Sequence, residues 1–596
     1  MNILLIQPPV QDFYQTEIRT QPLGLAYLAA ALQQHSHAVT ILDCQVPGRK
    51  KQLPLPAIFA YMKEYYDEKD MSPFRLYSKY FHFGLSYKEI SAYIKNCSPG
   101  AVGISCQFTP YVQETIKIAA LVKELSPGIP VIVGGAHASS LPEEILKIPS
   151  IDYVVIGEGE GVLPKLIHHI ESDKIPWELD SIGFKADGAM HINPRKNFIE
   201  DLDSLAFPAR HLFDCSCYRI DGRPCTMLLT SRGCPQNCAY CSVQNVMGKQ
   251  LRVRSPENIL REMRWCREEY GISLFDIEDD NFTFDAKRAI TLLSLIIDEF
   301  GKEEIKLFAM NGLSIISLNK ALLEMMQRAG FQHLDLSLGS SVIEANKNMD
   351  RPCDPAASAE VLKQAASLQF AVTTYIILGL PGQGLEEMID SLLYVMEKET
   401  YVGPSIFYPS PGTKIYQDIY KDTPADYSVL RSSVFPVETD IFSRLDIVTL
   451  LRLARWINFI KRRLLYNTIP EISFDALLQE SKAAWWAKGI PENFADAPES
   501  FFHRSLPKPF TPEESGALLT ALFLHWGTFF GIRRLRKRNK ELYTYRIFPY
   551  KTSARAIELF MERGKALTIK AAVTKSTKRN AGRQQHSCLH SPKINT

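Results

Sequence analysis

The chain has 596 residues, of which 46% are hydrophobic and 22% are charged, and its formal net charge is +2. This length exceeds what one hydrophobic core supports, and the balanced charge predicts no nucleic-acid partner. Twelve cysteines are spread along the chain, which is more typical of free thiols and metal ligands than of disulfides. The start, MNILLIQPPV, predicts a strand and not a signal peptide, so we expect a cytoplasmic protein.

Residues 1–170 alternate short apolar runs with segments of helical periodicity. This alternation predicts a Rossmann-like α/β domain with a parallel sheet covered by helices on both faces. Ligands of such sheets bind beyond the carboxyl ends of the strands. The loops expected there are small: Pro8-Pro9, Gly134-Gly135-Ala136-His137 and Gly157-Glu158. Residues 44–97 form a polar, aromatic-rich insertion, and residues 171–224, interrupted by prolines, are expected to be a connector.

Residues 225–420 repeat a strand–helix unit six times, which predicts a partial, open (βα)6 TIM-like barrel with its chemistry at the carboxyl ends of the strands. The first strand leads into the loop Cys234-Pro-Gln-Asn-Cys238-Ala-Tyr-Cys241. A cubane iron–sulfur cluster takes four ligands, so three thiolates leave one iron open to another molecule. A closed zinc site needs a fourth protein ligand. Zinc and incidental buried thiols stay as alternatives.

The spacing of these three cysteines, with Tyr240 just before the last, resembles the signature of the radical S-adenosylmethionine (SAM) superfamily. The resemblance implies that Cys234, Cys238 and Cys241 ligate a [4Fe-4S] cluster, whose open iron chelates SAM and whose electron cleaves it to a deoxyadenosyl radical. It also implies SAM contacts near Tyr240 and at later strand ends: Asp279, Asp280, Ser340, Tyr375, Gly379 and Gly382. At Ser340 the chain departs from the family, because the acid of the family's Gly-Ile-Glu-Ser stretch is missing.

The stretches QPP, PLGLAYLAAAL, VGGAHAS and DYVVIGEGE resemble the cobalamin-binding domain that precedes the barrel in one branch of this superfamily, the class B methyltransferase-like enzymes. The resemblance implies that cobalamin is held by the loops at Pro8, Pro9, Gly134, Gly135, Gly157 and Glu158, with His137 as a further contact. The DxHxxG motif that supplies an axial histidine to cobalt elsewhere is absent. A degenerate domain that no longer binds cobalamin is the alternative.

Residues 421–564 are expected to form a helical C-terminal domain. It would begin with an amphipathic helix over 443–466 that carries Arg452, Arg455, Lys461, Arg462 and Arg463 on its polar side. The uncharged stretch 515–532, followed by basic residues, predicts a buried cap helix over the barrel mouth. Contact with a membrane surface through 515–538 is the alternative. The basic tail, 565–596, is expected to be disordered.

These features together predict a cobalamin-dependent radical SAM methyltransferase that acts on an unactivated carbon of a small-molecule or lipid substrate. The resemblance also implies an external electron donor of the flavodoxin or ferredoxin type. One alternative uses the same cofactors for cyclisation or rearrangement without methyl transfer. A second alternative is a zinc-stabilised binding module. Substrate specificity is expected to lie in residues 44–97 and in the chain after 420.

Overall fold

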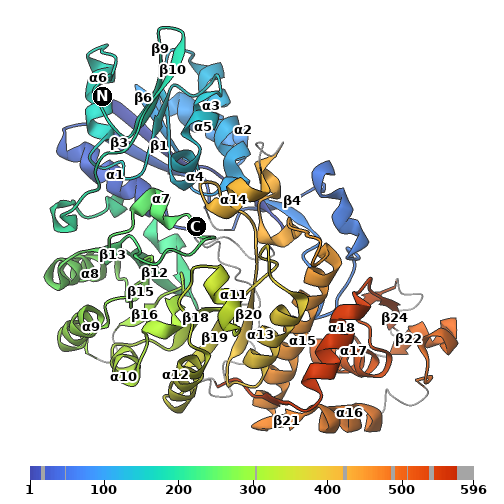
Figure 1. Ribbon diagram of the computed structural model, residues 1–596. Helices are drawn as coiled ribbons and strands as arrows, with labels where there is room; N and C mark the ends of the chain where they lie inside the picture. Colours follow the sequence, from blue (N-terminus) through green and yellow to red (C-terminus); the bar gives the residue numbers. More distant parts are fainter. Residues whose placement is uncertain are drawn as a thin grey trace.

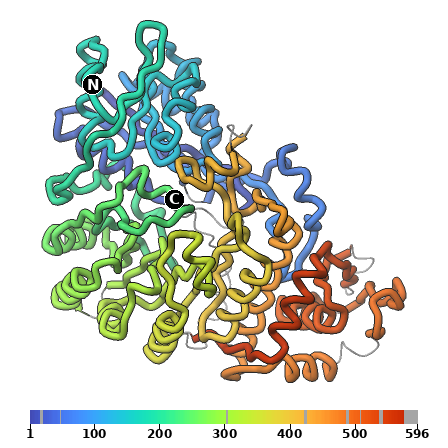
Figure 2. The backbone as a smooth tube through the Cα atoms, in the orientation of Figure 1, coloured from blue at the N-terminus to red at the C-terminus, as the bar shows by residue number. Residues whose placement is uncertain are grey.

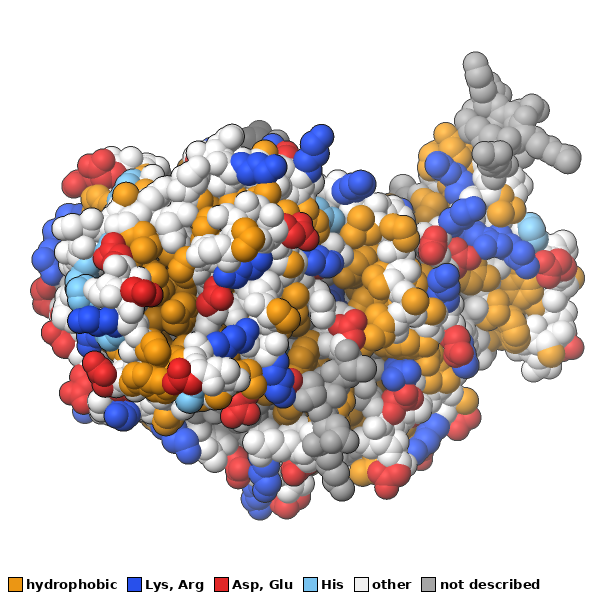
Figure 3. Space-filling view, turned by 90° about the horizontal axis from the view of Figure 1, so that it is seen from above, with side chains coloured by type: hydrophobic (Ala, Val, Ile, Leu, Met, Phe, Trp, Pro, Cys, Tyr) orange, Lys and Arg blue, Asp and Glu red, His pale blue; other side chains and the backbone are white. Residues whose placement is uncertain are grey.

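The computed structural model describes residues 1–14, 20–46, 48–301, 305–420, 426–484, 490–506, 508–535 and 543–573. An N-terminal sheet, a barrel and a C-terminal module follow one another along the chain (Figure 1). The backbone tube shows that a blue segment of the N-terminal region crosses to the orange and red C-terminal module (Figure 2). On the face seen in Figure 3, Lys and Arg side chains are interspersed with Asp and Glu.

The N-terminal sheet has seven strands in the order β10-β9-β8-β7-β6-β1-β3. Along β1, Ile3 and Leu5 join one buried cluster whereas Leu4 and Ile6 join the other, so both faces are covered as predicted. The strands are β1 (Asn2–Gln7), β3 (Ala38–Asp43), β6 (Ala101–Ser105), β7 (Val131–Gly134), β8 (Tyr153–Val155), β9 (Ile182–Ala186) and β10 (Ala189–Asn193). The helices are α1 (Leu23–Gln34), α2 (Tyr87–Cys97), α3 (Val112–Leu125), α4 (Ala136–Ser140), α5 (Pro142–Leu146) and α6 (Leu163–Glu171).

Strands β9 and β10 lie inside the predicted connector, so that prediction is wrong for residues 182–193. β9 pairs antiparallel with β8, and β10 pairs antiparallel with β9, which extends the otherwise parallel sheet at one edge. A hairpin of this kind needs only a short turn, here at Asp187 and Gly188, both with positive φ.

The barrel follows the predicted succession of six strand–helix units, with a further two-residue strand at Leu313–Ser314. The predicted helix starts are confirmed at Ser255 and Asp285, whose side chains cap α8 and α9. The sheet runs β12-β15-β16 and then β17-β18-β19-β20, with a bridge between Leu307 and Phe331 joining the two parts. The strands are β12 (Arg223–Leu228), β15 (Leu274–Ile277), β16 (Lys306–Phe308), β17 (Leu313–Ser314), β18 (His333–Gly339), β19 (Ala371–Leu378) and β20 (Tyr401–Ile406). The helices are α8 (Pro256–Tyr270), α9 (Ala286–Phe300), α10 (Lys320–Arg328), α12 (Pro355–Ser367) and α13 (Leu385–Met396).

Helix α15 (Arg444–Tyr466) covers the barrel beside β20. The Asn458 side chain donates to the Val402 carbonyl and accepts from the Val402 N–H, at 2.7 and 2.8 Å, which satisfies backbone groups at the sheet edge. Near the other end of the helix, Ile447 packs against Gly379, which follows β19. Helix α15 therefore runs antiparallel to β20, from the barrel mouth towards the amino ends of the strands.

The C-terminal module contains two small antiparallel sheets, so the prediction of a purely helical domain is wrong. Its helices are α16 (Phe474–Ala483), α17 (Pro512–Trp526) and α18 (Ala554–Gly564), and its strands are β21 (Glu471–Ser473), β22 (His503–Leu506), β23 (Phe530–Arg534), β24 (Tyr543–Pro549) and β25 (Thr568–Lys570). Because β25 pairs with β21, the predicted disordered tail does not begin at 565. The rest of that tail, 574–596, lies outside the described residues.

The uncharged stretch 515–532 is a helix and a strand, because α17 ends at Trp526 with Gly527 in the left-handed region as its cap. Leu518, Leu519, Leu522 and Phe523 are buried in the module. These side chains are therefore buried, as the prediction of a buried helix requires. Among the described residues, no helix combines the length and hydropathy that crossing a bilayer requires.

The insertion joins the N-terminal region to the C-terminal module. Strand β5 (Tyr80–Phe83) pairs with β2 (Val10–Asp12) and β4 (Lys50–Leu53), and the 3₁₀ helix Ala57–Glu64 follows β4. The Met71 N–H donates to the Ile532 carbonyl at 2.8 Å. The ring of Phe74 packs edge-to-face on both Phe459 of α15 and Phe529. The stretch after the 3₁₀ helix therefore lies between the barrel and the C-terminal module.

Candidate active site

The three cysteines lie on a loop between β13 (Ser231–Arg232) and α7 (Val243–Met247), at the carboxyl end of β12. All three thiols are half-buried and free of disulfides. Gly233 has φ +84°, and a Cβ there would lie 2.3 Å from the Gln250 carbonyl oxygen. Only glycine fits this close approach, which starts the loop. Burial raises the pKa of the Cys241 thiol to about 12.

The two acids predicted to contact SAM hold the start of this loop. Asp279, 2% exposed, accepts from the Thr230 N–H and the Ser231 hydroxyl, each at 2.6 Å. Asp280 accepts from the Gly233 N–H at 2.9 Å, and burial raises its pKa to about 6. The structure therefore gives Asp279 a positioning role, and Asp280 binds the residue directly before Cys234.

Two side chains that the sequence prediction missed donate towards the thiols. Asn281 Nδ2 lies 3.8 Å from Cys234 Sγ, and its Oδ1 is buried without a hydrogen-bond partner. Arg351 Nη1 lies 4.0 Å from Cys238 Sγ and 2.7 Å from the Tyr240 hydroxyl. Its Nη2 donates to the Ser337 carbonyl at 2.7 Å. Such donors to sulfur are typical surroundings of cluster-ligating thiolates.

The other residues predicted to contact SAM fall at carboxyl ends of barrel strands, but their environments differ. Ser340 is fully buried, and its hydroxyl contacts the Ser391 hydroxyl at 3.1 Å and Glu387 Oε1 at 3.3 Å. Tyr375 on β19 lies over Gly403 of β20, where a Cβ would lie 2.7 Å from its ring. Gly379 and Gly382 have φ values of +89° and +87° in the turn after β19. Ser340 thus belongs to a structural hydrogen-bond network.

The loops predicted to hold cobalamin lie together at the carboxyl edge of the N-terminal sheet. Pro8 and Pro9 follow β1, and Gly134 and Gly135 end β7. A Cβ on Gly135 would lie 2.7 Å from the Cys106 carbonyl oxygen, so the fold itself requires this glycine. His137 is 2% exposed, and burial lowers its pKa to about 4.

The His137 ring has one nitrogen engaged and one unsatisfied. Nδ1 lies 3.0 Å from the Thr109 hydroxyl, whereas Nε2 has no hydrogen-bond partner in the described structure. The Gln45 Oε1 atom, just after β3, is also buried and unsatisfied. Small loops with unsatisfied, uncharged polar atoms fit a large cofactor bound through backbone and shape.

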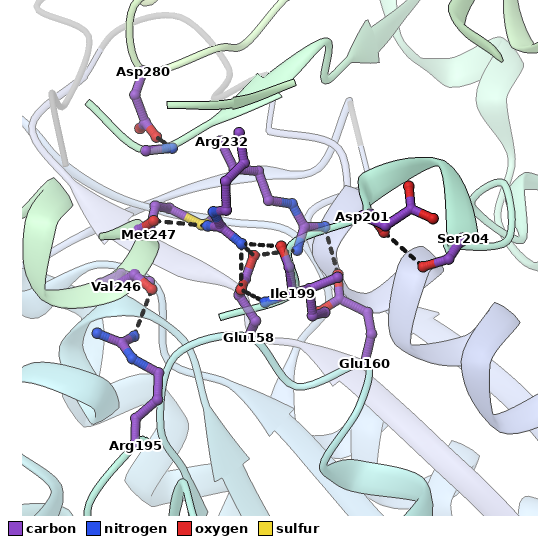
Figure 4. Close-up of polar contacts among 12 residues, drawn as sticks. Glu158, Glu160, Arg195, Ile199, Asp201, Ser204, Arg232, Val246, Met247 and Asp280 are labelled. Atoms are coloured by element: carbon purple, nitrogen blue, oxygen red, sulfur yellow. Dashed lines mark hydrogen bonds and ion pairs between the residues drawn. The ribbon is translucent and has the colours of Figure 1, made fainter. Parts of the chain in front are cut away.

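Glu158, the other residue predicted to contact cobalamin, is instead at the centre of an ion network with the barrel. Arg232, two residues before Cys234, contacts Glu158 at 2.8 Å and Glu160 at 2.6 Å, as Figure 4 shows. Arg252, in β14 (Arg252–Val253), contacts Glu158 at 2.7 Å. Burial acts to raise the pKa of Glu158, but the two guanidinium groups outweigh it and lower that pKa. We call Glu158, Glu160, Arg232 and Arg252 the junction network.

Three backbone contacts reinforce this junction. Arg195, which follows β10 and lies across Gly157, donates to the Val246 carbonyl of α7 at 2.7 Å. The Ile199 N–H donates to Glu158 at 2.9 Å, so the predicted connector is part of the interface. A Cβ on Gly412 would lie 2.3 Å from Asn245 Nδ2 and 3.5 Å from Ser140 of α4. The loops of the N-terminal sheet therefore pack on the chain that follows the cysteines.

The donor set fits an iron–sulfur cluster. Within the described residues, no three His, Cys, Asp or Glu side chains are grouped as ligands of one metal ion. In a cubane cluster each thiolate binds a different iron, so the three thiols need not converge on one ion. Sequence signals for the missed residues existed but were weak. Asn281 directly follows the two acids, and Arg232 stands next to the cysteine loop. Arg351 lies in the loop between α11 (Ile343–Asn348) and α12, far from the cysteines in the sequence.

Comparison with known proteins matches two family models to these two regions. Residues 228–395 match the radical SAM superfamily, and residues 78–167 match the B12 binding domain. A cytidylyl-2-hydroxyethylphosphonate methyltransferase from Streptomyces wedmorensis is 28% identical over 448 residues, which are 69% of this chain and 79% of that protein. A hopanoid C-3 methylase from Methylococcus capsulatus is 24% identical, over 70% of this chain and 72% of that one.

Solved structures share the fold. TsrM from Kitasatospora setae, a radical SAM methyltransferase, superimposes with a TM-score of 0.53 at 17% identity, over 70% of this chain and 76% of that chain. The cobalamin-dependent SAM radical enzyme OxsB gives a TM-score of 0.52 at 17% identity, over 70% of this chain and 55% of that chain. At these identities the likeness shows the fold alone, a Rossmann-like domain followed by a partial barrel.

Proposed function

We propose, from the membership of this chain in the cobalamin-binding radical SAM family, that it methylates an unactivated carbon of a small-molecule substrate. The observation that carries the proposal is the junction. There the loops at the carboxyl edge of the N-terminal sheet pack against the segment that follows the three cysteines. The [4Fe-4S] cluster, SAM and cobalamin are the cofactors of this family. When bound, they supply the radical and the methyl group.

The chain's own residues would hold these groups in the following way. Cys234, Cys238 and Cys241 provide the thiolates, with Asn281 and Arg351 donating to the sulfur atoms. Asp280 and the unsatisfied Asn281 Oδ1 are the acceptors available for the amino group of SAM. Tyr375, Gly379 and Gly382 belong to β19 and the turn after it, and His137 Nε2, unsatisfied in the described structure, is the atom available to cobalamin.

The barrel and the junction also exclude water from the reacting groups. The thiol loop is half-buried, and Asp279 and the junction arginines that fix it are buried. Excluding water protects a carbon radical from side reactions and fixes the donors in place before reaction. We further propose that a reduced flavodoxin- or ferredoxin-like protein supplies the electron. The names of the two relatives give a phosphonate and a hopanoid as what those proteins act on, and neither is carried over to this chain.

Anaerobic product analysis tests this function. The protein is reconstituted with iron, sulfide and hydroxocobalamin, reduced, and given SAM, after which deoxyadenosine and S-adenosylhomocysteine are quantified. Both products, with S-adenosylhomocysteine dependent on cobalamin, are expected. Deoxyadenosine without S-adenosylhomocysteine would favour cyclisation or rearrangement, and neither product from a protein with a full cluster would contradict the proposal.

A further inference from the structure

Helix α15 carries buried cations that the sequence placed on a polar, solvated face. Arg452 and Lys461 are fully buried, which corrects that expectation. Arg452 donates to the carbonyls of Tyr65 and Lys551, and Lys461 donates to those of Met396, Lys398 and Lys570. Backbone oxygens therefore give each cation a structural explanation. The outer edge of the N-terminal sheet is different, because no strand of the described chain pairs with it.

This outer edge is strand β10, which projects with β9 as a hairpin at the top of Figure 1. Its sequence, Ala-Met-His-Ile-Asn, contains no Lys, Arg, Asp, Glu or Pro. Charged side chains and prolines are the usual devices that keep an edge strand from pairing with another chain. Because the turn has two residues, Ala186 and Ala189 form the closing hydrogen-bonded pair, and bonded pairs alternate from there. The N–H and C=O groups of Met190 and Ile192 therefore point away from β9.

Large apolar side chains are exposed on both faces of this edge. Met190 is 44% exposed, and Ile175 and Trp177, in the loop before β9, are 45% and 46% exposed. The Trp177 ring packs edge-to-face on His191, which points to the opposite face from Met190, with 4.7 Å between the ring centres. The Asn193 side chain of β10 donates to the Trp177 carbonyl at 2.9 Å and so fixes the loop. An exposed tryptophan held in place beside an unpaired edge matches the anchors of protein interfaces.

The edge is complementary to a second copy of itself. When two β10 strands pair antiparallel about His191, Met190 of each copy lies opposite Ile192 of the other, and the outward backbone groups of both residues are satisfied. In this register Asp187, in the turn of one copy, comes beside Lys196 of the other, just beyond the end of its strand. Both of these side chains are exposed, and their charges are opposite. Backbone groups, apolar side chains and charges thus all match under one two-fold axis.

We propose that this chain forms a symmetric dimer through β10, which joins two N-terminal sheets edge to edge. Met190 is the apolar anchor on one face of the joined sheet, and Trp177 is the anchor on the other. This interface goes beyond the proposed function, because none of the residues assigned to the cofactors belongs to β9 or β10. A contact made by one strand and its neighbours is small, so the dimer is in concentration-dependent equilibrium with the monomer.

Sedimentation velocity of the full-length, reconstituted protein under anaerobic conditions tests the dimer. Wild type should sediment increasingly as a dimer as its concentration rises. Met190→Lys places a charge on the edge and should raise the dissociation constant by roughly tenfold or more, and Trp177→Ala should act in the same direction. The matched control is Met71→Lys, at a methionine of the insertion that is 42% exposed, and it should dimerise as wild type does.

A second set of variants tests the register. Lys196→Glu sets a like charge beside Asp187 of the other copy and should weaken the dimer several-fold. Adding Asp187→Asn removes that repulsion and should restore part of the affinity, since asparagine tolerates the positive φ of this turn position. A dimer that is unchanged by Met190→Lys and by Lys196→Glu uses another surface, which would overturn the proposal.

The oligomeric state of wild type decides between a second copy and any other occupant of the edge. A wild-type protein that stays monomeric up to about 100 µM, where a weak edge contact would still be populated, would overturn the proposal. Deoxyadenosine formation should be equal in Met190→Lys and wild type. The dimer and the proposed function are therefore tested independently of each other.

Discussion

Two groups of arginines, one at the junction and one beside α15, differ in what balances their charge. In the junction network, Arg232 and Arg252 face Glu158 and Glu160 at 2.6 to 2.8 Å. Beside α15, Arg455 faces Tyr77 and another cation and has no paired carboxylate in the described structure. A balanced network fixes two surfaces in one geometry. A half-buried cation that contacts an aromatic ring in place of a carboxylate does not fix two surfaces in this way.

Breaking the junction should have the largest effect. Glu158→Gln leaves Arg232 and Arg252 with one less buried carboxylate, and removing one partner of such a network costs about 3 kcal/mol of unfolding free energy. Because Arg232 adjoins the cysteine loop, iron content after reconstitution should also fall. Anaerobic denaturant unfolding and iron analysis measure both effects. The exposed Glu499→Gln is the control, and should change stability by about 0.5 kcal/mol or less.

The pH dependence of the stability of Glu158→Gln tests the direction of this effect. The folded pKa of Glu158 is lowered, so its contribution is present above the ordinary glutamate range and is lost as pH falls through the lowered pKa. The stability difference between wild type and Glu158→Gln should therefore shrink in acid. A difference that stays constant down to the acid limit of folding would contradict the ionised network.

Arg351 is an intermediate case, because its partners are Tyr240, Ser337 and the Cys238 thiol. Arg351→Lys keeps the charge but loses the fork that reaches all three. We expect the cluster to assemble with a more negative midpoint potential, since fewer hydrogen bonds reach the sulfur. Redox titration followed by electron paramagnetic resonance measures the shift. An unchanged potential would show that the 4.0 Å contact does not act on the cluster.

The smallest change in stability is expected at the unbalanced cation. Arg455→Met removes a half-buried charge that has no paired carboxylate in the described structure, so the unfolding free energy should stay the same or rise by about 1 kcal/mol. Thermal unfolding of Arg455→Met and Glu158→Gln under the same conditions compares the two changes in stability directly. A loss as large as that of Glu158→Gln would mean that Arg455 is a structural cation, and would erase the contrast between the two regions.

Most of the fold could be predicted from local patterns in the sequence. Apolar runs and caps at Ser255 and Asp285 placed the barrel elements, because these signals depend on neighbours in sequence. The hairpin β9–β10 was missed because prolines around it suggested a connector. The junction network and the burial of Arg452 and Lys461 were missed for a different reason. Charged residues on one face of a helix predict that this face is exposed to solvent. The segment that buries them is distant in sequence, so the sequence pattern does not reveal it.

Electron paramagnetic resonance of the reduced, reconstituted protein with and without SAM tests the central claim, a cluster on three thiolates with one open iron. Wild type and the control Cys353→Ala should give a reduced-cluster signal whose shape changes when SAM is added, and Cys238→Ala should give neither cluster nor SAM-dependent change. A Cys238→Ala protein with the iron, sulfide and SAM response of wild type would contradict the account.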